Sequence, residues 1–439
     1  MWSLSEPSFT PPRGMRDLDA REMARRLWIN EKILNVFKLY GFKMVEPTAI
    51  EHLATLEAKS GPAIREEVYW FKDKAQRDLG LRFDLTVGMT RMVANDPTME
   101  EPIKLASISN MWRYDEPQFA RYRSFYQWDA EIYGSANPEA DAEVICLTAD
   151  VIEAFDLRDY EIRFSNRKLT EGFLDSVGVP SESLDQTFRT IDKYRKIGEE
   201  EFIKELQKLQ LERSQIRRIR DLVAVRGDPK ETLRSALNMT DRSEKIAQGE
   251  SELKGLVEAL ESYEKLDRCI LDLSIVRGLG YYDGTVFEAY DRGGEDVGAI
   301  AGGGRYDGLC RLYGKRDMPA TGVAGGIERL IISLERGAKL PELAPGPTVF
   351  VAYANDSVRP KAWGIAQLLR AKGIACDTDL KRRSLRRQLE YCDNQRIPKV
   401  VIVGPRELQE NRVKLRDMKT ETEREVPIDN LPKEVVKSI

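Results

Sequence analysis

Residues 112–134 concentrate side chains that could bind a charged substrate. Arg113 and Arg121 come early in this stretch, and Gln127 and Glu131 follow at alternate positions of its second half. A proline interrupts the first half, because proline supplies no backbone donor to a β-ladder. The stretch predicts a long hairpin that brings cations, an amide and a carboxylate to one polar cleft with aromatic walls. A hairpin with a solvated polar face fits the same periodicity.

Two more segments carry side chains of the same kind. The segment LRFDLT, residues 81–86, alternates like a strand and places Asp84 and Thr86 on one face. Residues 322–335 combine glycines with a helical pattern and carry Arg329 on an early turn of the predicted helix. Each segment by itself also fits an exposed, solvated surface.

Glycine recurs in residues 275–290, at positions 278, 280 and 284, and is dense in residues 301–309. Glycine lets the backbone turn tightly or approach a ligand, so we expect a glycine-rich turn against a substrate in each segment. Neither contains a Walker pattern or a G-x-G-x-x-G fingerprint in the right unit, which argues against those two phosphate cradles. The side chains that the two segments present are Arg277, Tyr281, Tyr282, Arg305 and Tyr306.

Composition restricts the chemistry further. The 439 residues include five scattered cysteines and a single histidine, His52. The cysteines form no C-x-x-C pair, which argues against a thiolate zinc site and a disulfide framework and fits a reducing cytoplasm. With one histidine in a polar stretch, a Ser-His-Asp triad or a histidine-rich metal centre is nearly excluded. An enzyme built from this chain would therefore work with carboxylates, arginines and bound ions.

Two or three domains must position these motifs, because 439 residues exceed what one core accommodates. No uncharged apolar run is long enough to predict a membrane span, and no signal peptide is recognisable. Residues 19–40 predict a helix whose apolar face consists of Met23, Leu27, Leu34 and Phe37. Strand patterns follow at 68–73, 79–85 and 271–276, a helix at 136–155, and mostly helical, highly charged sequence at 167–265.

A Pro- and Gly-rich linker ends near residue 347 and marks a domain boundary. Beyond it, strand and helix patterns alternate, which predicts a small α/β unit with mostly parallel strands. Residues 347–439 carry 19 Lys and Arg against 13 Asp and Glu, a net charge of +6 in a chain whose total is −4. A basic cluster lies where a loop enters a helix, and it would attract a phosphate backbone or form a solvated basic face. Its members are Lys381, Arg382, Arg383, Arg386 and Arg387.

Taken in order, these segments resemble the class II aminoacyl-tRNA synthetases, and more narrowly the histidyl-tRNA synthetase family. Residues 112–134 are similar to motif 2, with its Arg-x-acid opening, its arginine-rich loop and a Phe before a strand, and residues 322–335 are similar to motif 3. Residues 275–290 and 301–309 resemble the two signatures of histidyl enzymes, R-G-L-D-Y-Y and G-G-R-Y-D. Asp115, Ala120 and Gly280 depart from the pattern, standing where Glu, Gly and Asp are usual in the family.

The resemblance implies an α/β fold of the α+β kind, in which an antiparallel sheet flanked by helices forms the catalytic core. This core would comprise residues 1–166 and 266–340. A helical insertion would occupy residues 167–265 and approach the tRNA acceptor stem. An α/β anticodon-binding domain would occupy residues 347–439.

The resemblance also implies an activity. Members of the family activate L-histidine with ATP to histidyl-adenylate and then transfer histidine to the 3′-terminal ribose of tRNA(His). Mg²⁺ would arrive with ATP, because the sequence shows no metal-ligand cluster of its own. Arg113 and Arg277 would be the catalytic cations at the reacting centre.

The remaining roles are carried over residue by residue. ATP would contact Arg113, Asp115, Arg121, Phe125 and Arg329. Histidine would contact Asp84, Thr86, Arg113, Gln127, Glu131, Arg277, Tyr281, Tyr282 and Tyr306. The tRNA would contact the basic cluster at residues 381–387.

The helix and strand of residues 19–47 resemble motif 1, which forms the dimer interface in the family. The resemblance therefore implies a cytoplasmic homodimer. A different function stays open, that of a non-catalytic histidine sensor such as the regulatory subunit of ATP phosphoribosyltransferase. Such sensors generally lack the catalytic arginines and the anticodon-binding tail, and both are present in this sequence.

Overall fold

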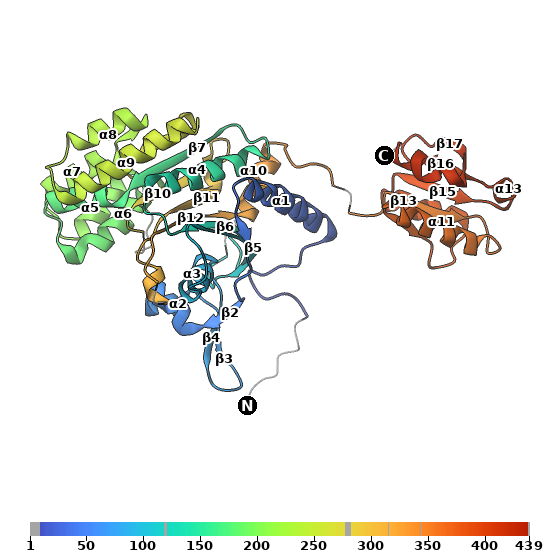
Figure 1. Ribbon diagram of the computed structural model, residues 1–439, viewed down its shortest axis with the longest axis horizontal. Coiled ribbons are helices and arrows are strands. Elements are labelled where there is room, and N and C mark those ends of the chain that lie inside the picture. The colour runs from blue at the N-terminus through green and yellow to red at the C-terminus, as the bar shows by residue number, and fades with distance from the viewer. Residues whose placement is uncertain (1–8, 118–120, 277–281, 315, 344, 438–439) are drawn as a thin grey trace. The chain divides into compact units, whose positions relative to one another are not determined.

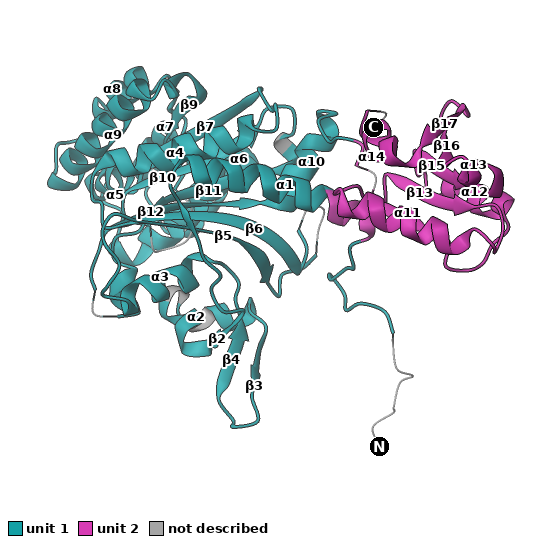
Figure 2. Cartoon of the chain, turned by 45° about the vertical axis from the view of Figure 1, so that its right-hand side comes forward, with its two compact units in different colours: residues 1–18, 25–341 teal, residues 19–24, 342–439 magenta. Residues whose placement is uncertain are grey.

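The computed structural model describes residues 9–117, 121–276, 282–314, 316–343 and 345–437. The chain forms two compact units, shown in two colours in Figure 2. Unit 1 consists of Met1–Leu18 and Arg25–Pro341, and unit 2 of Asp19–Ala24 and Glu342–Ile439. No helix among the described residues is both long enough and apolar enough to cross a lipid bilayer.

A large sheet organises unit 1 (Figure 1). Its described strands pair antiparallel, except that β1 and β5 run parallel, as do β7 and β9. The predicted antiparallel sheet with flanking helices is thereby confirmed. In spatial order the strands are β1 (Lys43–Met44), β5 (Ile103–Trp112), β6 (Ser124–Tyr133), β12 (Ala320–Gly326), β11 (Ala301–Arg305), β10 (Thr285–Asp291), β7 (Tyr160–Asn166), β9 (Cys269–Asp272) and β8 (Arg226–Gly227).

The two faces of β6 have opposite characters, because alternate side chains of a strand point to opposite sides. Trp128, Ala130 and Ile132 are at most 2% exposed and pack in the main hydrophobic core. Helices α1 (Ala20–Leu39) and α4 (Pro138–Glu153) supply the other side of that core. The odd-numbered residues of β6 point away from these helices, and that face carries the candidate site.

Helix α1 forms as predicted but buries a different face. Its buried apolar residues are Ile29, Ile33, Val36 and Phe37. Met23 and Leu27, which we expected on the inner face, are 37% and 61% exposed. The error arose because apolar residues surround this helix on more than one side, so periodicity alone did not select the side that meets the sheet.

A three-stranded sheet stands apart from the large one and is formed by β2 (Ile50–His52), β4 (Asp78–Leu81) and β3 (Trp70–Lys72). The predicted strand 79–85 ends early, because after Leu81 the Arg82 carbonyl accepts from the backbone N–H of Trp112 in β5, and the Arg82 guanidinium donates to the carbonyls of Pro47 and Asn110. Asp84 then accepts a hydrogen bond from the backbone of Val87 at 3.0 Å and so caps helix α3 (Thr86–Asn95). Asp84 and Thr86 therefore lie at a helix start, and our prediction that they share a strand is wrong.

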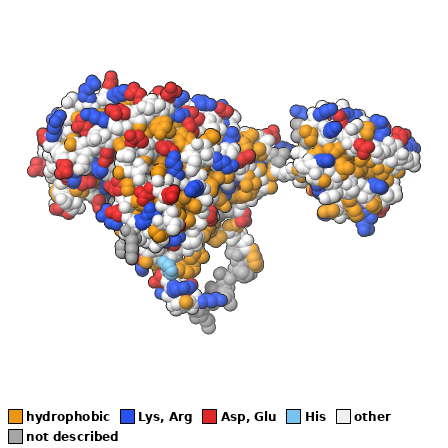
Figure 3. All heavy atoms as spheres, in the orientation of Figure 1, with side chains coloured by type: hydrophobic (Ala, Val, Ile, Leu, Met, Phe, Trp, Pro, Cys, Tyr) orange, Lys and Arg blue, Asp and Glu red, His pale blue; other side chains and the backbone are white. Residues whose placement is uncertain are grey.

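Between β7 and β9 the chain is mainly helical, as the sequence predicts. Asn166 caps the first of these helices by accepting from the backbone of Leu169. Phe202, Leu206 and Ile219 of this region are fully buried. Charges of both signs are interspersed over this part of the surface (Figure 3). The helices are α5 (Arg167–Ser176), α6 (Ser181–Lys208), α7 (Arg213–Val223), α8 (Pro229–Leu237) and α9 (Glu244–Ser262).

Unit 2 has its own sheet and its own hydrophobic core. The expected α/β alternation is present, but only the first three strands run parallel. The three strands that the sequence predicts do run parallel, and two further strands that it did not predict complete the sheet in antiparallel pairing. The strands in spatial order are β14 (Cys376–Thr378), β13 (Val349–Tyr353), β15 (Lys399–Val403), β16 (Arg412–Asp417) and β17 (Glu423–Pro427), with helices α11 (Arg359–Ala371) and α12 (Leu385–Asn394).

Candidate active site

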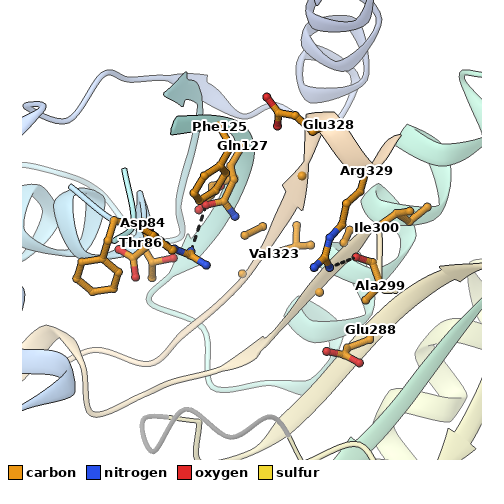
Figure 4. Close-up of a pocket in the computed structure, with 18 of the residues that line it drawn as sticks. Asp84, Thr86, Phe125, Gln127, Glu288, Ala299, Ile300, Val323, Glu328 and Arg329 are labelled. Atoms are coloured by element: carbon orange, nitrogen blue, oxygen red, sulfur yellow. Dashed lines mark hydrogen bonds between the residues drawn. The ribbon is translucent and has the colours of Figure 1, made fainter. Parts of the chain in front are cut away.

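A cavity of about 370 Å³ lies on the odd-numbered face of β6. Phe125, Gln127, Asp129 and Glu131 line it from this strand. Figure 4 shows Asp84, Thr86 and Gln127 on one side of the cavity, with Arg329 and Glu288 on the other. Most of the predicted site residues that the structure describes therefore meet in one place.

The floor of the cavity is mostly backbone. Gly322 of β12 lies directly opposite Glu131, and a Cβ atom on this glycine would stand 1.4 Å from the Glu131 carboxylate. Residues 301–305, which we expected to form a glycine-rich turn, instead form strand β11, so that prediction is wrong. Glycine is required within β11 because this strand lies between β10 and β12 and packs closely against β12. A Cβ on Gly303 would lie 1.9 Å from a backbone oxygen of β12.

One end of the cavity holds a buried carboxylate with hydroxyl donors around it. Glu131 is 1% exposed and accepts from the Thr86 hydroxyl at 2.7 Å and from the Tyr306 hydroxyl. Burial, together with the neighbouring Glu131 charge, holds the pKa of Tyr306 well above its usual value. Tyr306 therefore keeps its proton, and the Tyr282 ring meets it edge to face at 6.5 Å.

Arg113 stands beside this acidic end. Its Nε donates to the Phe83 carbonyl at 2.9 Å, which fixes the direction of the guanidinium. One Nη lies 3.5 Å from the Gln127 amide oxygen, and the guanidinium carbon lies 5.0 Å from the centre of the Phe125 ring. The predicted neighbours Arg113, Phe125 and Gln127 are thus packed together.

Two further arginines reach the cavity from separate segments. Arg329, on helix α10 (Ile327–Arg336), donates to the Ala299 carbonyl at 2.8 Å. Arg121 lies 2.8 Å from the Asp115 carboxylate and is half exposed. Burial lowers the pKa of Arg329, and the positive charges of Arg121 and Arg113 lower it further. Three arginine charges thus act on the same cavity, which is an arrangement that binds a polyanion.

A buried ion pair involves Glu328, the residue before Arg329, and sequence reasoning missed it. Glu328 is 7% exposed and accepts from the Arg26 guanidinium of α1 at 2.9 Å. The same carboxylate accepts from the backbone N–H of Tyr126 at 3.1 Å, next to Phe125 in β6. The Arg26 guanidinium carbon also lies 3.9 Å from the centre of the Tyr126 ring. The pair therefore joins α1, β6 and α10.

Some site residues were outside our predictions. Asp129 is fully buried and lines the cavity between Gln127 and Glu131, so the two-residue alternation could have identified it. Glu288 of β10 lines the Arg329 side, and nothing in the sequence distinguished it. Two predicted residues, Arg277 and Tyr281, lie outside the described part of the chain. Within that part, no group of three or more His, Cys, Asp or Glu side chains could hold a metal ion.

The basic cluster of unit 2 is partly occupied by internal contacts. Arg383 pairs with the buried Asp379 and stacks on the Tyr391 ring at 4.1 Å. Arg386 is strongly exposed and pairs with Glu390 one turn later on α12. Lys381, Arg382 and Arg387 are also exposed. Exposed cations are thus available at this surface, whereas Arg383 is committed to the unit's own fold.

Known proteins of similar sequence identify the family to which this site belongs. The family model for histidyl-tRNA synthetase matches residues 14–330, and the model for an anticodon binding domain matches residues 348–438. The chain is 40% identical to the histidine–tRNA ligase of Pyrococcus abyssi, covering 95% of this chain and 96% of the relative. It is 37% identical to that of Pyrococcus furiosus, with the same coverage.

A solved structure shows the same likeness. The histidyl-tRNA synthetase from Nostoc sp. PCC 7120 superposes with a TM-score of 0.85 and 28% identity, covering 99% of this chain and all of that one. Full-length matches of this kind confirm the predicted enzyme class, a ligase that joins an amino acid to tRNA. By its sequence and its fold, the chain belongs to the histidyl-tRNA synthetase family.

Proposed function

We propose that this chain activates L-histidine with ATP in the cavity described above and then transfers histidine to tRNA(His). One observation supports the proposal most strongly. Arg113 and Arg121 of one hairpin and Arg329 of a distant helix all line one cavity whose opposite end holds the buried acid Glu131. The cations suit a triphosphate, and the acid suits an imidazole N–H.

Activation requires the carboxylate of one substrate to attack the α-phosphorus of the other. Both reactants are negatively charged, so alignment and positive charge are needed more than a base. Arg113 would hold the α-phosphate, and Arg277 would sit across the reacting centre. Arg121 and Arg329 would bind the outer phosphates, with Asp115 orienting Arg121 through their 2.8 Å ion pair. Phe125 would stack on adenine.

Selection of histidine would rest on the acidic end of the cavity. Glu131 already accepts from Thr86 and Tyr306, and a carboxylate has further lone pairs with which to accept an imidazole N–H. Tyr282 would pair with the other ring nitrogen, with Tyr281 nearby. Asp84, Thr86 and Gln127 would receive the amino and carboxylate groups. An amino acid without the ring would offer no N–H to the remaining acceptor positions of the buried acid, and a polar mismatch of this kind can reject it by about 10⁴–10⁵.

Mg²⁺ would enter with ATP. The ion prefers oxygen ligands and is commonly bound by one or two carboxylates together with substrate phosphates. Glu288 lines the Arg329 side of the cavity and fits this role without a larger ligand cluster. When bound, Mg²⁺ would neutralise charge on the outer phosphates.

The rest of the chain would serve tRNA binding and assembly. The match of residues 348–438 to an anticodon binding domain supports a tRNA contact through the exposed part of the basic cluster. Residues 1–166 and 266–340 would form the catalytic core, and the helices of 167–265 an insertion that approaches the acceptor stem. Exposed Leu27 and Leu39 of α1 and Met44 of β1 support a homodimer through this region. A cytoplasmic location agrees with the unpaired cysteines.

The test is ATP–pyrophosphate exchange with each of the twenty amino acids. We expect exchange with histidine alone, and its loss in Glu131→Ala while ATP still binds. Exchange with another amino acid would redirect the proposal, and unchanged exchange in Glu131→Ala would remove this residue from the pocket. A chain that binds histidine but exchanges no pyrophosphate would be the histidine sensor instead.

A further inference from the structure

Two tyrosines of the cavity come from different segments of the chain. Tyr282 lies before β10 and Tyr306 directly follows β11. The Tyr306 hydroxyl donates a hydrogen bond to Glu131, so the position of the segment that carries Tyr306 also determines the position of the Glu131 carboxylate. Any side chain that fixes the two segments relative to one another therefore shapes the end of the cavity proposed to bind histidine.

Asp283 makes such a connection, directly after Tyr282. Its backbone N–H donates to the Arg305 carbonyl at 3.1 Å. One carboxylate oxygen accepts from the backbone N–H of Asp307 and the other from that of Gly308, each at 3.3 Å. These three hydrogen bonds hold Asp283, which follows Tyr282, against Arg305 and Asp307, which flank Tyr306, and against Gly308.

The segment that Asp283 holds is itself firmly anchored. Arg305 is 3% exposed and donates to Asp141 of α4 at 3.1 Å and to Asp307 at 3.2 Å. The Asp307 carboxylate also accepts from the backbone N–H of Ala320 in β12 at 3.0 Å. Asp283 therefore ties the Tyr282 segment to a frame that includes α4, β11 and β12.

We propose that Asp283 is a positioning residue for the histidine subsite, which its carboxylate shapes by holding the Tyr282 segment against the Tyr306 segment. The inference rests on the proposed function for what the cavity binds. Asp283 is not among the described residues that line the cavity, so it acts through Tyr282 and Tyr306.

The charges around Asp283 make this connection sensitive to pH. Burial and the nearby Asp307 carboxylate raise the pKa of Asp283 to about 6, against the two backbone hydrogen bonds from Asp307 and Gly308 and the smaller effect of the Lys168 charge on α5. Arg167, also on α5, carries another nearby positive charge, whereas the Arg305 guanidinium pairs with Asp141 and Asp307. The raised value means that the folded protein binds the proton more tightly than the unfolded chain does, so this group lowers stability as pH rises from about 4 to about 6. The ionised form present above pH 6 accepts both N–H groups.

The first experiment measures the connection itself. Hydrogen exchange of the backbone amides at Asp307 and Gly308 is followed by mass spectrometry in the full chain and in Asp283→Ala. We expect faster exchange at these two amides, because their acceptor is gone, and unchanged exchange in the control Asp267→Asn, whose side chain is 72% exposed. Equal exchange in wild type and Asp283→Ala would overturn the inference, whatever the cavity binds.

The second experiment measures the consequence for substrates in pyrophosphate exchange. Asp283→Ala should raise KM for histidine about tenfold, while KM for ATP changes less than about twofold. Asp283→Asn, which keeps one acceptor oxygen, should fall between. Equal increases in both KM values would show a merely structural role and overturn the inference. Absence of exchange in the wild-type chain would instead contradict the proposed function, and the amide measurement would still decide the role of Asp283.

A pH series adds a readout that a structural role would not produce. The ratio of KM for histidine between Asp283→Ala and wild type removes the titration of the substrate's own imidazole, because that is common to both. We expect this ratio to fall as pH drops through about 6, where wild-type Asp283 becomes protonated, toward the ratio between Asp283→Ala and Asp283→Asn, because a neutral carboxyl also keeps one acceptor oxygen. A ratio that is constant across this range would contradict the role of the ionised carboxylate.

Discussion

Gly322 shows how much of this cavity depends on an absent side chain. We expect Gly322→Ala to impair histidine-dependent pyrophosphate exchange strongly, because its Cβ would overlap the Glu131 carboxylate and lie 2.9 Å from the Ala130 carbonyl. Overpacking of this kind costs about 1–3 kcal/mol, which corresponds to about 5- to 150-fold in the affinity for histidine. KM for histidine, measured with ATP saturating, checks the prediction.

Gly364 of α11 provides the matched control. No atom lies within 4 Å of a Cβ placed on this residue, and it sits inside a helix. Gly364→Ala should leave exchange unchanged and stabilise its unit by about 0.5–1 kcal/mol, because alanine has the better helix propensity. If both substitutions affected exchange alike, crowding at Glu131 would not be the cause.

At the scale of single residues, the sequence predicted those site residues whose side-chain direction follows from their position in a strand. The alternation in β6 was sufficient to place Gln127 and Glu131 on one face of the sheet. The contact of Arg26 with Glu328 spans 302 positions, and no local pattern contains it. The glycines of β11 were mistaken for a turn. Glycine is favoured at turns for its backbone conformational freedom and in closely packed strands for its lack of a side chain, so its presence does not distinguish the two.

At the scale of elements, the Arg26–Glu328 pair joins α1 to the strand and the helix that carry Phe125 and Arg329. Arg26→Ala would leave Glu328 buried with its main cationic partner removed. We expect a loss of about 3–5 kcal/mol in the free energy of unfolding, measured with urea, and a raised KM for ATP. Burial already raises the pKa of Glu328, and removal of Arg26 should raise it further.

The adjacent residue is the control for this prediction. Arg25 pairs with Glu335 at a similar distance, 2.8 Å, but the two side chains are 29% and 49% exposed. Arg25→Ala should therefore change the unfolding free energy by less than about 1 kcal/mol. Similar losses in the two variants would mean that burial does not set the strength of the inner pair.

Elements were predictable where apolar periodicity was strong and were missed where charge obscured it. Strand β16 buries Val413 and Leu415, but Arg412, Lys414, Arg416 and Asp417 surround them, so the segment did not read as a strand. Helix α3 begins at Thr86, where the Asp84 carboxylate accepts from the backbone N–H of Val87. The segment LRFDLT was mistaken for a strand because a short alternating run of apolar and polar residues occurs both in strands and at helix starts.

At the scale of the whole molecule, the acidic chain concentrates its positive charge in unit 2. We expect tRNA binding to weaken with salt, and substitution of both Arg386 and Arg387 by Ala to reduce the slope of log K against log[salt] by roughly one to two. Titration of labelled tRNA at several salt concentrations checks this. An unchanged slope would show that the exposed part of the basic cluster is a solvated face.

Arg383→Ala separates tRNA contact from folding within the same cluster. Because Arg383 pairs with Asp379 and stacks on Tyr391, its removal should lower the stability of unit 2. Loss of the salt-dependent slope without loss of stability would place Arg383 on the tRNA surface instead. The sequence could locate the cluster but could not distinguish its inward-paired arginine from its exposed ones.

The bare floor formed by β11 and β12 limits how this cavity can be redesigned. Much of that floor is main chain, so few atoms can be trimmed from it to admit a bulkier amino acid. Widening would have to begin at the walls, with Phe125, Tyr282 or Tyr306, each of which has another contact to keep. Engineering toward a smaller amino acid would have to add side-chain volume at these walls, because the floor glycines accept none, and engineering toward a larger one would have to replace a wall residue by a smaller one.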